Sequence, residues 1–265
     1  LKNVVASGGL YMNIKLNKAI SEIKNLRDIF ISGSAGDESL SIGACYYLAQ
    51  KDKTYPLKDL YLGYREEKIN FKSLPKDIKF YQIKNFKPII KYLNQGKIVG
   101  MFNERAEFGA RALGNRSILA RPDLFGTVKK INEAVKNRDF WMPFAISILY
   151  EHHKKYIINK KSLRSPHMTM GFDTNLKNLK KIVSGTHPYD ETVRPQILER
   201  KFNHKYYDLI RGFYKKTKIP ALLNTSLNLH GKPTVSNFKQ AIFTLRNSKL
   251  DCLVVNYKYI FFKKK

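Results

Sequence analysis

Cysteines, acidic residues and long apolar runs are all scarce in this sequence of 265 residues. Two cysteines, Cys45 and Cys252, are too few for a disulfide framework or a cysteine-rich zinc module. Both lie in apolar runs, which predicts two buried thiols in a reducing, cytoplasmic compartment. No apolar stretch approaches the roughly 18 residues that a membrane span needs, and no signal peptide is recognisable. We therefore expect neither a disulfide-rich secreted domain nor a membrane protein.

Basic residues outnumber acidic ones by 49 to 21, which gives a formal charge of +28. A surplus of this size attracts anions such as nucleic acid or phosphorylated small molecules. Most of the lysines are spread along the whole chain, which a simple compositional bias also explains. The arginines are fewer and several lie in one segment, which indicates a more specific anion site. The hydrophobic fraction of 43% is that of a globular protein with one large or two smaller domains.

The first fifty residues repeat the order strand, glycine-rich turn and helix. The first turn is Gly8-Gly9, and the second ends at Asp37. Backbone amides at such turns bind phosphates, and an aspartate at a strand end can hold a divalent cation, although one aspartate is not a metal site. A segment this short buries too little surface to be stable alone, so we expect it to pack on something else. The expected strands are 3–7 and 29–31, and the expected helices are 10–18 and 42–49.

Strands continue to alternate with helices further along the chain, which favours an α/β architecture. Prolines and scattered charges predict a linker over 61–85, so that the chain divides into an N-terminal piece (1–60), this linker and a domain over 86–265. Within that domain the expected helices are 89–93, 128–138, 206–213 and one capped by Ser236 or Asn237, and the expected strands are 98–102, 143–149, 221–223, 253–255 and 259–262.

The stretch richest in chemical groups follows the strand expected at 98–102. There Arg105, Arg111 and Arg116 alternate with glycines. Guanidinium groups match phosphate and carboxylate bidentately, and glycine lets a backbone approach a ligand closely, so the stretch favours a polyanionic small molecule. The alternative is that the neighbouring glutamates, Glu104 and Glu107, pair with the arginines as structural salt bridges. The pattern alone does not decide between the two.

Two other polar segments are weaker signals. Lys136 and Arg138 lie at the end of an expected helix, where a favourable contact with the helix dipole is the plainer explanation. Asn224, Ser226 and Asn228 follow a strand in a polar loop, where open α/β sheets place ligands, although Asn and Ser also favour ordinary turns. The six histidines show no metal-ligand spacing.

Taken together, these segments resemble the O-carbamoyltransferase family, which includes nodulation-factor and antibiotic carbamoyltransferases. Residues 107–119, EFGARALGNRSIL, are similar to the family's signature EFGPRALGNRSIL. Segments at 132–145, 193–196 and 224–233 follow in the family's order, and the N-terminal turns look like two turns of its larger domain. The departures are Ala110 for proline, Met142 for arginine, Ile146 for proline and Lys232 for glutamate.

The resemblance implies an α/β fold in two parts. The C-terminal domain would be a twisted open sheet with helices, resembling the threonylcarbamoyl-adenylate synthase fold of tRNA modification. A fragment of an actin-like ATPase-superfamily lobe would precede it. The family's N-terminal half, with a His-x-x-x-His metal pair, has no counterpart here, so the sequence resembles the C-terminal portion of a longer enzyme or a truncated relative. Because Leu1 stands directly before a strand, we expect further residues upstream.

The activity that the resemblance implies has two stages. Carbamoyl phosphate and ATP give carbamoyl-adenylate, with release of phosphate and pyrophosphate, and the carbamoyl group then passes to a hydroxyl of a sugar or similar small-molecule acceptor. Two polyanions must be held together, so fixed cations are expected. The predicted catalytic clamp consists of Arg105, Arg111, Arg116, Lys136 and Arg138. The predicted substrate- and nucleotide-binding residues are Arg194, Asn224, Ser226, Asn228, Gly8 and Gly9.

The sequence also leads to an expectation about a metal and to two alternative functions. Asp37 resembles the family's remaining metal ligand and would hold a divalent metal, Fe or Mg, only in the full-length enzyme. The charge and the 12% aromatic residues also fit an RNA- or tRNA-binding or tRNA-modification protein, so the charge does not exclude nucleic acid. A third alternative is an inactive fragment. The acceptor is not readable from the sequence, and a homodimer is compatible with it.

Overall fold

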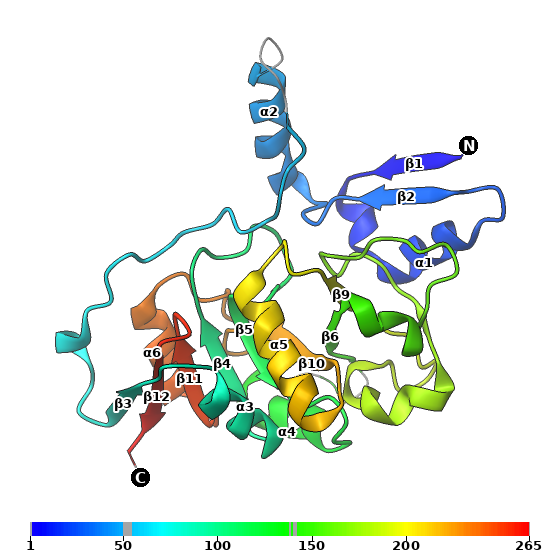
Figure 1. Ribbon diagram of the computed structural model, residues 1–265. Helices are drawn as coiled ribbons and strands as arrows, with labels where there is room; N and C mark the ends of the chain where they lie inside the picture. Colours follow the sequence, from blue (N-terminus) through cyan, green and yellow to red (C-terminus); the bar gives the residue numbers. More distant parts are fainter. Residues whose placement is uncertain (1, 50–54, 138, 140–141, 265) are drawn as a thin grey trace.

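Eight strands form one mixed sheet that crosses the molecule (Figure 1). The computed structural model describes residues 2–49, 55–137, 139 and 142–264. In spatial order the strands are β3 (Ile78–Gln82), β12 (Tyr259–Lys263), β11 (Cys252–Val255), β4 (Val99–Phe102), β5 (Arg116–Ala120), β10 (Ala221–Ser226), β6 (Ala145–Leu149) and β9 (Pro195–Leu198). The pairs β4–β11 and β6–β9 are parallel, and the other five neighbouring pairs are antiparallel. The expected α/β class is confirmed.

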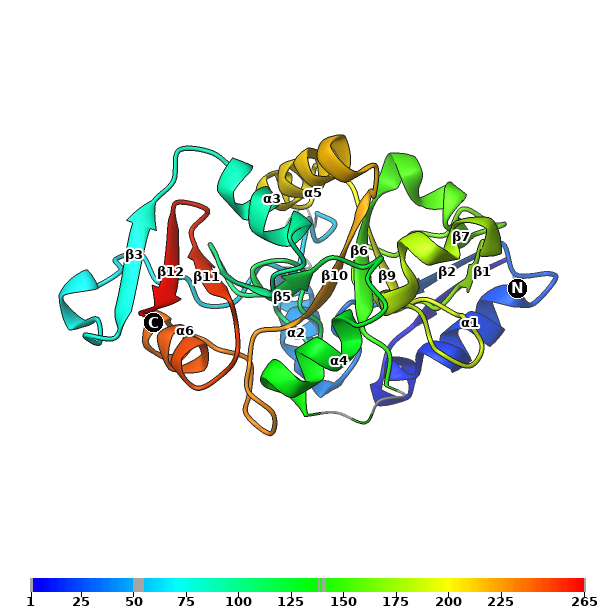
Figure 2. The same ribbon diagram turned by 90° about the horizontal axis from the view of Figure 1, so that it is seen from below.

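Helices cover both faces of this sheet (Figure 2). One apolar cluster joins α3 and α5 to strand side chains such as Met101, and a second joins α4 and α6 to strand side chains such as Phe102. Successive residues of a strand point to opposite faces, so burial of both faces favours apolar residues at every position, as in β4 and β11. The helices are α3 (Lys87–Asn94), α4 (Thr127–Ile131), α5 (His204–Thr217) and α6 (Phe238–Arg246). In the part of the chain that the structure describes, no helix has both the length and the apolar character to cross a membrane.

The N-terminal piece forms a separate small sheet. β1 (Asn3–Ala6) and β2 (Asp28–Ile31) pair in parallel, and α1 (Ile14–Glu22) connects them. The inward side chains of both strands share one apolar cluster with β6, where Ile146 and Ile148 are buried. The small sheet is therefore joined to the rest of the chain by a common core.

One helix of this piece is different. α2 (Leu40–Leu48) projects from the body, and none of its residues is buried (Figure 1). The thiol of Cys45 is exposed on this helix, whereas Cys252 is buried in β11. The prediction of two buried thiols is therefore correct for Cys252 and wrong for Cys45, because the apolar run around Cys45 belongs to α2, in which no residue is buried.

Several elements differ from the sequence-based expectation. α1 begins at Ile14 and not at residue 10, because the side chain of Asn13 accepts the N–H groups of Lys15 and Leu16 and so caps the helix. The strands β3, β5 and β9 were not expected, and β3 lies within the segment 61–85 that the sequence predicts to be a linker. The remaining short elements are 3₁₀-helices at Gly9–Met12, Asp37–Ser39, Phe71–Ser73, Tyr150–Lys155, Leu176–Lys181 and Val183–Gly185, and the strands β7 (Ile157–Ile158) and β8 (Asp173–Thr174).

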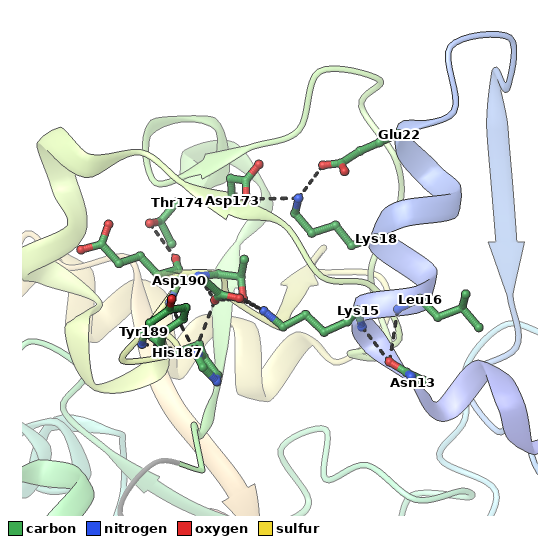
Figure 3. A network of polar contacts seen from close by, with 12 residues as sticks. Asn13, Lys15, Leu16, Lys18, Glu22, Asp173, Thr174, His187, Tyr189 and Asp190 are labelled. Atoms are coloured by element: carbon green, nitrogen blue, oxygen red, sulfur yellow. Dashed lines mark hydrogen bonds and ion pairs between the residues drawn. The ribbon is translucent and has the colours of Figure 1, made fainter.

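A polar network ties α1 to a distant loop (Figure 3). Lys15 pairs with Asp190 and donates a hydrogen bond to Thr192 Oγ1 at 2.9 Å. Lys18 bridges Asp173 at 3.2 Å and Glu22 at 2.6 Å. Burial alone would raise the pKa of the Asp190 carboxyl, but the hydrogen bonds from Lys15 and Thr192 outweigh it and hold this pKa well below its usual range. These contacts fix α1 on the body.

His167 gives the fold a dependence on pH. Its ring fills the space beside Gly33, since a side-chain carbon placed on Gly33 would lie 2.5 Å from it. Burial lowers the pKa of His167 to about 4, and the nearby charge of Asp59 offsets this only in part. Between pH 6.5 and 4 the unfolded chain therefore binds a proton that the folded chain does not, and the fold loses stability as the pH falls.

We expect the variant His167→Gln to lose this part of the pH dependence. Between pH 7 and pH 5 the wild type should lose on the order of 2 kcal/mol more free energy of unfolding than the variant. Urea unfolding at the two pH values measures the difference. His204→Gln, at the exposed start of α5, is the matched control and should behave as the wild type does. An equal pH dependence in the wild type and His167→Gln would contradict this account.

Candidate functional site

A buried ammonium group marks the candidate site. Lys136 is the last residue of a π-helical turn, Asn132–Lys136, that continues α4, and it is only 1% exposed. Its Nζ donates to the Ser226 carbonyl oxygen at 2.6 Å, to Ser226 Oγ at 3.1 Å and to Asn228 Oδ1 at 2.5 Å. Three predicted site residues, Lys136, Ser226 and Asn228, thus meet although they come from two distant segments. We call them the Lys136 cluster.

The loop after β10 is fastened to the same helix end. The backbone N–H of His230 donates to the Val135 carbonyl at 3.1 Å, and His230 Nδ1 contacts the Lys136 carbonyl oxygen. Because a carbonyl oxygen only accepts, this contact makes Nδ1 the donor. Asn228 Nδ2 donates to the Lys232 carbonyl at 2.6 Å and closes the loop on itself. The acceptors around the ammonium group are therefore held in place before any ligand arrives.

Asn224 lies in the sheet and not in the loop predicted for it. It pairs with β5 at Leu119 and with β6 at Ala145, because β10 extends to Ser226 between these two strands. Its buried Nδ2 donates to the Ala112 carbonyl at 3.1 Å and to Ser147 Oγ at 3.0 Å. The contacts of Asn224 are thus with the signature segment (residues 107–119) and with β6.

The signature segment is organised around one carboxylate. Glu107 accepts the backbone N–H groups of Leu113 at 2.7 Å, Asn115 at 2.8 Å and Arg116 at 3.1 Å. Between them Gly114 has a φ of +116°, and a side-chain carbon there would lie 2.3 Å from the ring of Tyr206. Only glycine fits both the conformation and the space.

The arginines of the signature do not gather at one cavity. Arg116 is completely buried, and its guanidinium donates to the Asn103 carbonyl at 2.5 Å and lies over the ring of Phe102 at 3.9 Å. Burial lowers its pKa, which the charge of Glu107 partly offsets. Because Arg116 has no exposed surface, it cannot touch a substrate in this conformation. The predicted five-cation clamp therefore does not form around it.

The other two arginines bind different parts of the chain. Arg105 is exposed and donates to the carbonyls of Leu62 at 2.7 Å and Gly63 at 3.1 Å. Arg111 is half-buried and donates to the Met12 carbonyl at 3.4 Å, across to the N-terminal piece. Arg138, the fifth member of the predicted clamp, lies outside the described residues.

The glutamates of this region do not pair as the salt-bridge alternative suggested. Glu104 binds Lys205 at 2.5 Å and Arg65 at 3.5 Å, and Glu107 serves backbone amides as described above. Burial opposes ionisation of Glu104, but the hydrogen bond from Lys205 lowers its pKa below the usual value. Glu107 as the centre of the signature segment was not predicted. Its place at the start of that segment was the only signal in the sequence.

A cavity of about 730 Å³ lies beside the helix that ends at Lys136. Asn132 and Asn137, at the two ends of the π-helical turn, form part of its wall, and the segment 179–191 forms the opposite part. No member of the Lys136 cluster is among the described residues that line it. The apolar lining residues are Phe125, Val128, Met142, Pro143, Leu179, Val183 and Pro188.

Arg194 lines a second, smaller cavity of about 100 Å³. Lys15 and Lys18 of α1 line it as well, so three cationic side chains surround this space. Pro143 and His187 belong to the walls of both cavities, which makes them neighbours. Arg194 is thus brought together with lysines that were not predicted as site residues.

The N-terminal site residues lie on the surface. Gly8 donates its N–H to the Ala35 carbonyl at 2.7 Å, and Gly8 and Gly9 are both exposed. Asp37 is exposed at the start of a 3₁₀-helix. Across the described ranges, no three His, Cys, Asp or Glu residues gather into a group that could hold an ion. Asp37 and its described neighbours therefore do not fit a metal site by themselves.

A known family profile matches the larger part of this chain. The sequence profile described as "Carbamoyltransferase C-terminus" matches residues 90–262. The chain belongs to the carbamoyltransferase family. It corresponds to the C-terminal portion, as the signature segment predicted. The family match supports the carbamoyltransferase assignment that the motifs predicted. It adds nothing to the alternative of nucleic-acid binding, which rests on charge and composition.

Curated relatives of this carbamoyltransferase chain are longer than it is. The uncharacterized protein MJ1051 of Methanocaldococcus jannaschii is 37% identical over 97% of this chain and 50% of its own length. The nodulation protein NolO of Bradyrhizobium diazoefficiens is 34% identical over 94% of this chain and 47% of its own. The chain thus spans about half the length of these relatives. Among solved structures, full-length HypF in its phosphate- and nucleotide-bound form aligns with 67% of this chain and 24% of its own, at 14% identity and a TM-score of 0.43.

We expect Glu107→Gln to destabilise the fold. The amide keeps one oxygen, but it loses the charge and turns an NH₂ group toward backbone donors, so buried N–H groups are left without acceptors. The free energy of unfolding should fall by about 1–3 kcal/mol, which urea unfolding at neutral pH would measure. Glu133→Gln is the matched control, because Glu133 is exposed and its ion pair with Lys129, at 3.8 Å, is a long surface contact. Equal stability of Glu107→Gln and the wild type would show that the amide contacts do not organise the segment.

Proposed function

We propose that this chain carries the carbamoyl-adenylate-forming site of a carbamoyltransferase. The observation that supports this most is the Lys136 cluster, a pre-positioned ammonium group in the region where the family profile matches. We further propose that residues 86–265, together with the edge strand β3, form the catalytic domain, with a sheet related to the threonylcarbamoyl-adenylate synthase fold. Residues 1–60 would then be part of an actin-like lobe.

The proposed reaction uses carbamoyl phosphate, ATP and one water molecule. Water cleaves carbamoyl phosphate into carbamate and phosphate. A carbamate oxygen then attacks the α-phosphorus of ATP, the bond to the leaving pyrophosphate breaks, and carbamoyl-adenylate forms. Each step brings negative groups together, so the protein must hold positive charge and hydrogen-bond donors at fixed places. Positioning and electrostatics are sufficient, and no protein nucleophile is needed.

Lys136 would supply the fixed positive charge. Its ammonium group donates to oxygens of Ser226 and Asn228, both of which are half-buried. Because Lys136 is only 1% exposed, a phosphate oxygen would reach it by displacing one of these two side chains, and an ion pair would then replace a hydrogen bond to a neutral oxygen. This exchange would favour an anion over water at the cluster.

The two cavities would hold the remaining parts of the substrates. A volume of about 730 Å³ with apolar walls suits a flat ring such as adenine, and the amides of Asn132 and Asn137 could bind its polar edge. The small cavity would hold a second anionic group through Arg194, since Lys15 and Lys18 in its wall already pair with Asp190 and Asp173. In the second stage the carbamoyl group would pass to a hydroxyl of a small-molecule acceptor, with release of AMP and of the hydroxyl proton.

The exchange of labelled pyrophosphate into ATP, dependent on carbamoyl phosphate, tests the proposal. Lys136→Met should lower the exchange rate on the order of 100-fold, because a fixed charge opposite the phosphates is lost. Ser226→Ala should lower it by about tenfold, because it removes one neutral donor and one acceptor of the ammonium group. Lys239→Met, on the exposed side of α6, is the matched control and should keep the wild-type rate.

Thermal unfolding of each variant separates loss of chemistry from loss of fold. Full exchange in a folded Lys136→Met variant would remove the Lys136 cluster from the mechanism. A wild-type chain that catalyses no exchange with carbamoyl phosphate would refute the proposed function for this chain.

A further inference from the structure

A polar cavity lies at the end of β6 and β9 opposite to Arg194. These two strands run in parallel, and Tyr150 and Glu199 directly follow their last residues. Both residues line a cavity of about 270 Å³. Arg194 directly precedes β9, so the length of that strand, on the order of 13 Å, separates this cavity from the anionic group proposed above. The carboxyl ends of parallel strands are where open α/β sheets bind ligands.

Two cationic side chains in the wall of this cavity have no partner within the described chain. Lys154 and Arg164 are exposed, and neither side chain forms an ion pair or a hydrogen bond with a described residue. The carboxylate in the wall, Glu199, already pairs with Lys201 at 2.6 Å. The charges of Lys154 and Arg164 therefore remain uncompensated. A doubly charged anion would compensate both, and the planar fork of arginine matches the oxygens of phosphate.

A buried imidazole supplies the opposite kind of group. His153 is only 3% exposed and lines the same cavity. Its Nδ1 lies 2.5 Å from the Tyr150 carbonyl oxygen, which can only accept, so Nδ1 is the donor and Nε2 of the neutral ring carries a lone pair. No described residue donates to Nε2. A ligand hydroxyl suits this acceptor better than an ammonium group, which the two cations would repel.

The wall around Arg164 is held in place by hydrogen bonds on both sides of it. The side chain of Asn159 donates to the Leu163 carbonyl at 2.8 Å and accepts the Leu163 N–H at 2.9 Å. Ser165 Oγ donates to the Pro195 carbonyl at 2.8 Å and so fastens the next residue to β9. Arg164 stands between these two anchors. A site that is formed in advance loses less conformational freedom when its ligand binds.

We propose that this cavity binds a small phosphate ester that carries hydroxyl groups. The phosphate lies between Lys154 and Arg164, and a hydroxyl of the ligand donates to His153 Nε2. The volume of about 270 Å³ is well below the 730 Å³ of the cavity proposed for adenine and admits an ester of a few carbon atoms. None of the described residues in its wall lines either cavity of the candidate functional site, so this proposal does not depend on the proposed function.

Isothermal titration calorimetry of the full chain with glycerol 3-phosphate tests the charged end of the cavity. We expect one molecule to bind per chain. Lys154→Gln and Arg164→Gln should each weaken binding by about tenfold or more, because each removes a charge-assisted contact. Lys155→Gln is the matched control and should bind as the wild type does, because Lys155 is an exposed lysine of the same 3₁₀-helix but does not line the cavity.

Methyl phosphate, which has no hydroxyl on its carbon, tests the other end. The wild type should bind it about threefold or more weakly than glycerol 3-phosphate, because the hydrogen bond to His153 is missing. His153→Asn should abolish this preference and leave the affinity for methyl phosphate unchanged. The asparagine amide can still donate to the Tyr150 carbonyl, but it offers no acceptor at the position of Nε2.

Three results would overturn the proposal. The first is a wild-type chain that does not bind glycerol 3-phosphate. The second is binding that Lys154→Gln and Arg164→Gln leave unchanged, since the ligand would then lie elsewhere. The third is a wild type that binds methyl phosphate or aspartate as tightly, because the cavity would then take a bare anion or an amino acid. A folded His153→Asn variant that keeps the preference would likewise remove His153 from the site.

Discussion

Buried positive charge is the constraint on which much of this structure depends. A cation removed from water must be surrounded by oxygen acceptors, or it loses its proton or unfolds the site. Arg116 meets this requirement with backbone carbonyls of the segments around it, and Lys136 with Ser226 and Asn228. The acceptors of each cation belong to a segment of the chain other than the one that carries the cation. The cations therefore hold loops together as well as offering charge.

The position of β10 in the sheet explains why the important segments meet. It lies between β5, which ends the signature segment, and β6, and its last residue is Ser226. Asn224 on this strand binds the signature segment, and Ser226 receives the ammonium group of Lys136. One central strand thus connects the carboxylate-centred loop around Glu107 with the Lys136 cluster.

The sequence predicted some levels of this organisation and not others. Alternating strands and helices predicted the α/β class, and most expected elements lie close to their observed positions. β5 and β9 were missed because each begins at or directly after an arginine, Arg116 or Arg194, that was interpreted as ligand-binding. β3 was missed because an edge strand needs few apolar residues. Its five residues alternate little and lie among prolines and charges.

The site was predictable in part for a clear physical reason. The resemblance marked Lys136 as part of the cation clamp and Ser226 and Asn228 as binding residues, and the structure brings Lys136 Nζ within 3.1 Å of oxygens of both. The sequence could not show whether Arg116 belongs with them. An arginine beside glycines gives the same sequence pattern whether its side chain faces a ligand or a set of carbonyls. The approach of Lys15 and Lys18 to Arg194 depends on long-range packing of α1, which no local pattern records.

The π-helical turn before Lys136 has a consequence for how this segment can change. Within it the N–H of Asn137 reaches back five residues to the Asn132 carbonyl at 2.8 Å, one residue more than in an α-helix. This wide turn takes up one residue more than an α-helical turn, so deleting one residue before Lys136 would restore ordinary helical geometry and leave the following side chains in their present orientation. In an ordinary α-helix the same deletion would rotate the following side chains of the helix by about 100° about the axis. The turn is therefore a place where the segment can lose one residue while the ammonium group still points to β10.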